Sequence, residues 1–317
     1  MTDFSDPIYT NADSARKHLE KLRWPDGPYC PHCGELDQIT KLKGKSTRPG
    51  VYKCRTCRKP FSVTVGTLFE RSHIPLNKWL LAVHLLSASK NGMSAHQLHR
   101  MLGVQYKTAW FMAHRIREAM RPSSYGPMGG SRKAVEVDET YFGKREKPIE
   151  SPQRKGRPFT KKGKGGPRNK MAVLSLVERG GSVRTFHIDQ ASAATVREIL
   201  VRNVSRETTL YTDESNLYTK TGAEFGRHET VKHSAGEYAR GAVHTNTVEG
   251  YFSIFKRGMK GVYQHCAEKH LHRYLSEFDF RYNHRQIGDD ERAMVAVKGI
   301  IGRRLTYRWT AERAASA

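Results

Sequence analysis

Four of the five cysteines form two pairs with the same spacing, and this pattern constrains the fold more than any other feature of the chain. Cys30-x2-Cys33 and Cys54-x2-Cys57 are separated by 20 residues. Two such pairs supply four thiolates in the tetrahedral arrangement of a structural zinc site. Because the residues around the second pair favour short strands, we predict a zinc ribbon over residues 28–75 that holds a structural Zn²⁺ through these four cysteines.

The charge of the chain bounds the kind of partner it binds. The 317 residues include 55 Lys+Arg and 31 Asp+Glu, a formal net charge of +24. Such a surplus indicates a polyanionic partner, because each neutralised phosphate releases condensed counterions. No stretch is apolar enough to span a membrane, and the first residues lack the apolar core of a signal peptide. We therefore expect a cytoplasmic, nucleoid-associated protein with no membrane partner.

Helical patterns flank the predicted ribbon. Residues 1–27 indicate an N-terminal helix, and residues 76–121 have helical periodicity. Within the second segment, Ser94 and Gln97 form a capping box, and Gly103 predicts a tight turn between two helices. This pattern predicts a helix-turn-helix-like DNA-binding region, although a helical hairpin that only packs domains together has the same pattern. The residues expected on its open face are Lys107, Thr108 and Arg115.

The pattern changes to strands after a linker at residues 122–133. An α/β domain over residues 134–285 is indicated by a series of alternating elements: strands at 134–142, 171–177 and 183–188, a helix at 193–204 and a strand at 209–213. Residues 286–317 are expected to form a C-terminal helical extension.

A basic insertion interrupts the α/β domain between its first two strands. Residues 144–170 contain 11 Lys/Arg and 2 acids, together with several glycines and prolines. This composition favours a loop over packed structure. We expect the loop to bind the phosphate backbone through Lys161, Lys162 and Lys164.

Three acidic residues are candidates for chemistry. Asp138 and Asp213 each follow the apolar residues of a predicted strand, so both can reach the same edge of a sheet. Glu249 lies on a predicted helix, in a stripe spaced by three and four residues: Asn246, Glu249, Ser253, Lys256 and Lys260. Carboxylates brought together in this way repel one another, and two Mg²⁺ ions relieve that repulsion and activate water or a hydroxyl for phosphoryl transfer.

Four other acids compete for this role, namely Glu136, Glu139, Asp189 and Glu214. Glu139 and Glu214 each follow a favoured aspartate, so strand alternation directs them to the opposite face. Asp189 is expected to cap the helix that follows it. Glu136 has no such argument against it.

Five sequence blocks in a fixed order resemble a known family. They are CPHCG with YKCRTCRKPFSVTVGTLFE, then VEVDETYFG, YTDES, HTNTVEGYFSIFKRGMKG and YLSEFDFRYNHR, and together they span about residues 15–285. The chain resembles bacterial insertion-sequence transposases of the ISXO-type group. These enzymes join an N-terminal zinc ribbon to an acidic-triad, ribonuclease-H-like integrase domain.

The resemblance implies functions for particular residues. The first two acidic positions of the family fall on Asp138 and Asp213. At the third position both Asn246 and Glu249 are available, and we favour Glu249 as the Mg²⁺ ligand because a neutral amide binds this ion less well. The resemblance implies that Lys256 contacts terminal phosphates and that Lys260 contacts DNA.

The implied activity is Mg²⁺-dependent cleavage at the terminal inverted repeats of an insertion sequence, followed by strand transfer into target DNA. We expect at least a dimer on DNA, because such enzymes hold two ends. One alternative is a domesticated, non-catalytic DNA-binding regulator built from the ribbon and the helix-turn-helix. Another is a structure-specific nuclease on the same fold, which would cut without joining.

Overall fold

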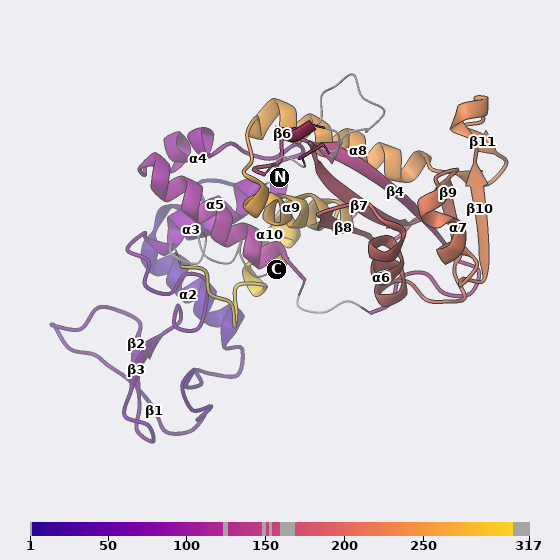
Figure 1. Ribbon diagram of the computed structural model, residues 1–317. Helices are drawn as coiled ribbons and strands as arrows, with labels where there is room; N and C mark the ends of the chain where they lie inside the picture. Colours follow the sequence, from indigo (N-terminus) through magenta and orange to yellow (C-terminus); the bar gives the residue numbers. More distant parts are fainter. Residues whose placement is uncertain (1, 123–125, 148–149, 152–153, 159–168, 307–317) are drawn as a thin grey trace. The chain divides into compact units, whose positions relative to one another are not determined.

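The structure is a computed structural model that describes residues 2–122, 126–147, 150–151, 154–158 and 169–306 (Figure 1). Its internal contacts divide the chain into two compact units. The first unit combines Met1–Pro122 with Gln286–Ala317, and the second is Ser123–Arg285.

A three-stranded antiparallel sheet and a packed helix form the N-terminal part of the first unit. The elements are α1 (Pro7–Thr10), α2 (Ala12–Arg23), β1 (Ile39–Lys41), β2 (Val51–Cys54) and β3 (Pro60–Ser62), with the strands in the order β1-β2-β3. Trp24 packs edge-on against the rings of Tyr52 and Phe61, at centroid distances of 5.4 and 5.9 Å. These aromatic contacts hold α2 against a sheet that is too small to bury a core of its own.

Four helices complete the first unit: α3 (Leu76–Ala88), α4 (Ala95–Leu102), α5 (Tyr106–Met120) and α10 (Asp289–Lys298). The Ser94 side chain accepts a hydrogen bond from the Gln97 backbone N–H at 3.1 Å, and α4 ends at Gly103 in the left-handed conformation with φ 59°. Both are the local signals on which the predicted helix-turn-helix rests. The C-terminal helix α10 packs on α3 and α5, so the end of the chain belongs to this unit.

The second unit is built on a five-stranded mixed sheet. Its strands are β4 (Ala134–Phe142), β7 (Met171–Glu178), β8 (Val183–Ile188), β9 (Thr209–Asp213) and β10 (Arg227–Val231). The spatial order is β10-β9-β4-β7-β8. Strands β4, β7 and β8 run antiparallel as a meander, whereas β9 and β10 run parallel to β4. This arrangement confirms the prediction of an α/β, ribonuclease-H-like domain.

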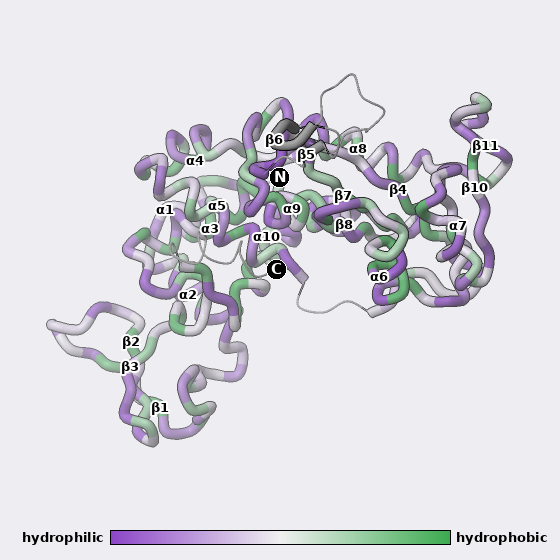
Figure 2. The backbone as a smooth tube through the Cα atoms, in the orientation of Figure 1, coloured by the Kyte–Doolittle hydropathy of each residue, from purple (hydrophilic) through white to green (hydrophobic). Residues whose placement is uncertain are grey.

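Helices cover both faces of this sheet. They are α6 (Ala193–Asn203), α7 (Asn216–Gly222), α8 (Asn246–Gly258) and α9 (Leu271–Asn283). Alternation along β7 divides the core: Leu174 and Leu176 face α6 and α7, whereas Val173 and Val177 face α8 and α9. In Figure 2 the green of hydrophobic residues runs along much of the sheet and along α9.

Shorter elements complete the second unit. They are β5 (Glu150–Ser151) paired with β6 (Arg154–Pro158), β11 (Ala239–Arg240) paired with β12 (Val243–His244), the 3-10 turns η1 (His233–Ala235) and η3 (Glu268–His270), and the π-helical turn η2 (Met259–Tyr263). The sequence pattern indicated neither β10 nor α7. In the part of the chain that the structure describes, no helix is both long and apolar enough to cross a membrane.

Candidate functional site

The four paired cysteines converge in the first unit. The Sγ atoms of Cys30 and Cys57 are 3.6 Å apart, those of Cys33 and Cys54 are 3.7 Å apart, and all four lie within 4.8 Å of one another. A tetrahedral zinc ion with Zn–S bonds of about 2.3 Å requires Sγ–Sγ separations of about 3.8 Å. The geometry therefore fits a structural zinc ion, and none of the four cysteines is in a disulfide.

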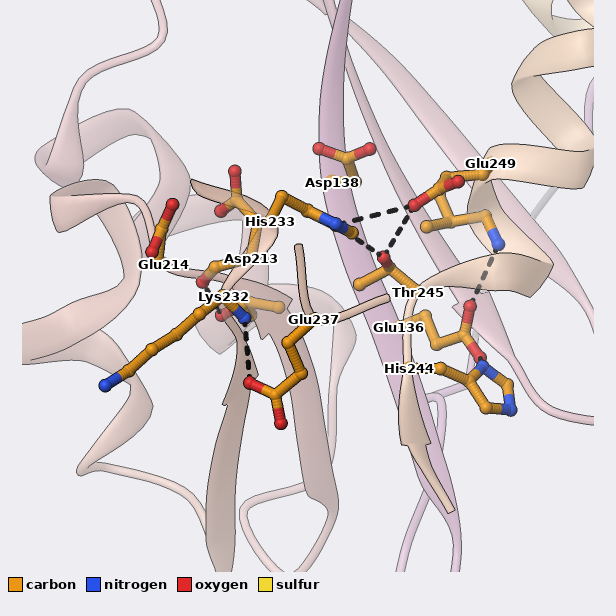
Figure 3. A network of polar contacts seen from close by, with 12 residues as sticks. Glu136, Asp138, Asp213, Glu214, Lys232, His233, Glu237, His244, Thr245 and Glu249 are labelled. Carbon is orange, nitrogen blue, oxygen red and sulfur yellow. Dashed lines mark hydrogen bonds and ion pairs between the residues drawn. The ribbon is translucent and has the colours of Figure 1, made fainter. Parts of the chain in front are cut away.

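Two candidate acids of the second unit lie level on adjacent strands, Asp213 at the end of β9 and Asp138 in the middle of β4. Glu136 of β4 lies opposite Tyr211 of β9 in a parallel pair, so Asp138, two residues further on, is level with Asp213. Strand alternation turns Glu136 and Asp138 to the face covered by α8. Figure 3 shows the carboxylate of Glu249, from α8, near that of Asp138. The structure thus brings together the three predicted acids from β4, β9 and α8.

Several carboxylates lie close to Asp138 and concentrate negative charge there. Burial raises the pKa of the Asp138 carboxyl to about 8. Neighbouring carboxylates add to this rise, and they belong to Glu139, Asp213 and Glu249. Within the described residues, the hydrogen-bond donors to Asp138 and Asp213 are backbone N–H groups, and neither acid has a lysine or arginine partner. Such a site favours binding of a cation.

Glu136 holds α8 against the sheet. Its side chain is fully buried, and Oε2 accepts hydrogen bonds from the backbone N–H groups of Thr247 at 2.8 Å and Val248 at 3.0 Å. Oε1 accepts from Arg179 Nε at 2.7 Å and from the Thr247 hydroxyl at 2.8 Å. A carboxylate from β4 therefore caps the first turn of α8, where unpaired N–H groups favour negative charge.

The Arg179 guanidinium extends this network. It donates to the backbone oxygens of Ala242 at 2.6 Å and His244 at 3.0 Å, and the His244 Nδ1 lies 3.3 Å from Glu136 Oε1 (Figure 3). The sequence pattern marks Glu136 only as a rival acid. The available signal was an acid within the apolar strand AVEVDETYF, two residues before Asp138 and on the same face.

Capping by Glu136 changes the function of Thr245, the N-cap residue of α8. An N-cap threonine ordinarily accepts from the first helical N–H groups. Here Glu136 accepts from them, and the buried Thr245 hydroxyl instead donates to Glu249 Oε1 at 2.8 Å. The Glu249 carboxylate is thereby oriented from its own helix. Glu249 and Asn246, which lies one turn earlier, are both exposed.

The remaining α8 candidates follow the predicted stripe. Lys256 is half-buried, with its Nζ 5.9 Å from the centroid of the Phe252 ring, and Lys260 is exposed in the π-helical turn η2. The opposite side of α8 is buried in the core. Both ammonium groups are therefore on the solvent side of the helix that carries Glu249.

The rival acids have structural partners. Glu139 faces away from α8 and accepts from the Tyr218 hydroxyl, as strand alternation predicts. The prediction that Asp189 caps the following helix is wrong, because the N-cap of α6 is Ser192, whose hydroxyl accepts from the Thr195 N–H at 3.2 Å. Glu214 accepts from both the N–H and the hydroxyl of Ser234.

The predicted DNA-contacting residues have different surroundings. Lys107 is exposed in the first turn of α5, and Thr108 is half-buried. Arg115 does not lie free on an open face as expected: its guanidinium donates to Leu305 O at 3.1 Å and stacks 4.8 Å from the Phe111 ring. Internal packing therefore uses this side chain. The predicted Lys161, Lys162 and Lys164 lie outside the described residues.

Comparisons with known proteins identify the family. Two family models match, a transposase zinc-ribbon domain over residues 10–60 and an ISXO2-like transposase domain over residues 129–283. An uncharacterized protein in the transposable element ISH50 of Halobacterium salinarum is 32% identical over 274 residues, which cover 83% of this chain and 88% of that relative. The chain belongs to the ISXO2-like transposase family. The transposase domain match contains Asp138, Asp213 and Glu249, and the ribbon match contains the four paired cysteines.

Solved structures with detectable similarity include two of the Mos1 transposase. The pre-cleavage Mos1 transpososome is 13% identical with a TM-score of 0.29, covering 92% of this chain and 90% of that chain. The Mos1 strand transfer complex is 14% identical with a TM-score of 0.28, covering 70% and 74%.

Metal analysis tests the zinc centre of this transposase. Cys54→Ser removes one of four thiolates, so the purified variant is expected to lose most of the single zinc ion held by the wild-type chain. Cys266→Ser is the matched control, because Cys266 is buried in the second unit, outside the cluster. Full zinc occupancy in Cys54→Ser would contradict the assigned ligand set.

Unfolding measurements test the Glu136 cap. Glu136→Ala leaves the Arg179 Nε–H and two α8 N–H groups without their acceptor, and we expect a loss of about 3 to 5 kcal/mol in the free energy of unfolding of the second unit. Glu136→Gln retains an acceptor oxygen of the same reach and should lose less. Equal stability of Glu136→Ala and the wild type would show that the cap does not hold α8.

The raised pKa of Asp138 predicts a pH-dependent stability difference. A carboxyl with a folded-state pKa near 8 and an ordinary unfolded pKa near 3.8 destabilises the fold increasingly as pH rises from about 4 to 8. Asp138→Asn removes that cost. Without added divalent ions or chelator, its melting temperature should exceed that of the wild type at pH 8, and the two should converge near pH 4. If Asp138→Asn melted at a lower temperature than the wild type at pH 8, the Asp138 carboxylate would not be destabilising.

Proposed function

We propose that this transposase cleaves phosphodiester bonds at the terminal inverted repeats of its element and joins the freed 3′-hydroxyls to target DNA in a Mg²⁺-dependent reaction. The observation that carries this proposal is the convergence of Asp138, Asp213 and Glu249 beside the end of β9 without a lysine or arginine partner among the described residues. Three carboxylates of this kind would hold Mg²⁺, a hard cation that prefers oxygen ligands.

Each acid has a distinct function in the proposal. Asp138 and Asp213 supply oxygen ligands from adjacent strands, and Glu249 supplies the third from α8. The charge of Glu249 acts on Asp138, and Thr245 directs its carboxylate, which supports Glu249 over Asn246 as ligand. When bound, the ions activate water or a 3′-hydroxyl and stabilise the leaving oxygen. Asn246 then orients substrate beside the ligands.

Two lysines, Lys256 on α8 and Lys260 in the following turn η2, hold the nucleic acid near the acids. Lys256 and Lys260 follow Glu249 on the exposed stripe of the helix, and we assign Lys256 to terminal phosphates and Lys260 to the adjacent backbone. Ammonium groups in this position neutralise phosphates next to the reacting bond. They also offset the negative charge that the three carboxylates would present to DNA.

DNA binding through the first unit is supported by its charge pattern. Between Glu70 and Glu118 the chain has no acidic residue and seven Lys/Arg. Lys107 is exposed where α5 begins, a turn without acids, so phosphate can approach the helix N-terminus. We assign recognition of the element ends to the zinc ribbon and to α4 and α5, and further backbone contacts to Thr108 and the basic insertion.

The complete reaction needs two DNA ends, so we further propose that the protein works as a dimer or higher assembly on DNA. A non-catalytic regulator would use the same ribbon and helices but would have no need of three clustered carboxylates. A structure-specific nuclease would need the carboxylates but would not join ends. An assay that follows cleavage and joining separately therefore distinguishes all three functions.

Substitution of the acids tests the proposed chemistry. Asp138→Asn, Asp213→Asn and Glu249→Gln should each reduce end cleavage and strand transfer in Mg²⁺ at least roughly 100-fold, because each removes a charged metal ligand. Binding to DNA carrying the terminal repeats should be unchanged, since recognition is assigned to the first unit.

Asp189→Asn is the matched control for this series, because Asp189 is an exposed acid of the same unit that follows β8, two strands away from β4, and pairs with Arg145. It should retain activity. Strand transfer at the wild-type rate by Asp213→Asn would overturn the mechanism. A wild-type protein that binds the repeats but never cleaves them would favour the regulator.

A further inference from the structure

The segment between β10 and β11 brings a histidine to the third acid of the site. His233 begins the short turn η1, two residues after Val231, which is paired with Asp213. Its Nε2 lies 3.3 Å from the Thr245 hydroxyl oxygen and 3.6 Å from Glu249 Oε1. Figure 3 shows the imidazole directed at both groups, with dashed lines to Thr245 and Glu249.

Hydrogen-bond counting assigns the direction of these contacts. Thr245 has one hydroxyl proton, and that proton is donated to Glu249 Oε1 at 2.8 Å. The Thr245 oxygen can therefore only accept from His233, so the imidazole carries a proton on Nε2. Glu249 Oε1 lies 3.6 Å from the same Nε2, at ion-pair distance but beyond a hydrogen bond. The histidine N–H therefore reaches the carboxylate oxygen through the threonine hydroxyl.

His233 is itself held by its neighbours in the chain. The Glu214 carboxylate accepts from the Ser234 N–H at 2.9 Å and from the Ser234 hydroxyl at 2.8 Å. The Tyr238 ring packs against the imidazole with centroids 5.4 Å apart. Because Glu214 directly follows Asp213, these contacts form a continuous path from the second acid, through the η1 turn, to the third.

We propose that His233 is a positioning residue that fixes Glu249, through Thr245, relative to the strand end carrying Asp213. The inference rests on the proposed function, in which Glu249 is a metal ligand. Glu136 ties α8 to β4, whereas His233 ties the same helix to the ends of β9 and β10. The two bridges are made by different residues, so the carboxylates of three elements keep one geometry before a metal ion binds.

Direct metal binding tests the inference without relying on activity. Mn²⁺ is titrated into zinc-loaded, full-length protein and followed by electron paramagnetic resonance. Loss of a group that orients a ligand typically weakens metal binding by about 10- to 100-fold. We expect His233→Ala and Thr245→Val each to raise the Mn²⁺ dissociation constant at least roughly 10-fold. The double variant should bind Mn²⁺ no more weakly than the weaker of the two single variants, because both side chains act through one carboxylate oxygen.

Rescue separates positioning from general damage to the fold. In His233→Gln the amide N–H reaches about as far as Nε2, so Mn²⁺ affinity should return to near the wild-type value. Lys232→Ala, an exposed neighbour in the same segment, is the control and should not weaken binding. In metal-free wild-type protein, the ¹⁵N shifts of His233 should show a proton on Nε2.

The outcomes distinguish the two levels of the proposal. Wild-type affinity in both His233→Ala and Thr245→Val, or a bare Nε2 in the metal-free protein, would overturn the positioning function while leaving the three-acid site intact. Absence of Mn²⁺ binding to the wild type, outside the zinc centre, would instead overturn the proposed metal site. If His233→Ala does not fold, Thr245→Val and the Gln variant still decide the question.

Discussion

The arrangement of the second unit depends on one buried carboxylate. Glu136 has no exposed surface, and a charge in that position is costly unless hydrogen bonds and an opposite charge compensate it. Arg179 and the first turn of α8 supply those partners. The helix that carries Glu249 is therefore fixed to the strand that carries Asp138 by an electrostatic requirement of the core, in addition to the apolar packing of Phe252 and Phe255.

Two acids on the same face of β4 illustrate how position decides function. Glu136 is surrounded by donors, whereas burial, and after it the charge of neighbouring carboxylates, raises the pKa of Asp138 to about 8. Glu136 stabilises the fold. Ionised Asp138 destabilises it through burial and repulsion from nearby carboxylates, and a bound cation would offset that cost. Because both acids belong to β4, the hydrogen bonds of Glu136 also hold Asp138 in place despite its destabilising charge. This division is consistent with the general observation that sites for chemistry are built at a cost in stability.

Local sequence signals account for much of the predicted fold. The cysteine spacing, the Ser94 cap and the left-handed Gly103 depend on residues close in the chain, so the amino-acid sequence is enough to identify them. Strand alternation likewise separates Glu139 from Asp138. The prediction that Arg115 faces outward fails because its partner Leu305 lies 190 residues away in the sequence. No local pattern encodes such a contact.

The sequence by itself determined the four cysteines that converge in the first unit and the class of the second unit, and it selected the three acids that we propose as metal ligands, because each depends on residue type, spacing or strand periodicity. Tertiary structure alone decided which acid the core neutralises, which hydroxyl is left to orient Glu249, and that His233 reaches the same carboxylate. These outcomes follow from competition among hydrogen-bond donors and acceptors brought together from β4, η1 and α8. A hydrogen-bond donor can bind any acceptor within bonding distance. Which acceptors lie that close is decided only when the chain folds.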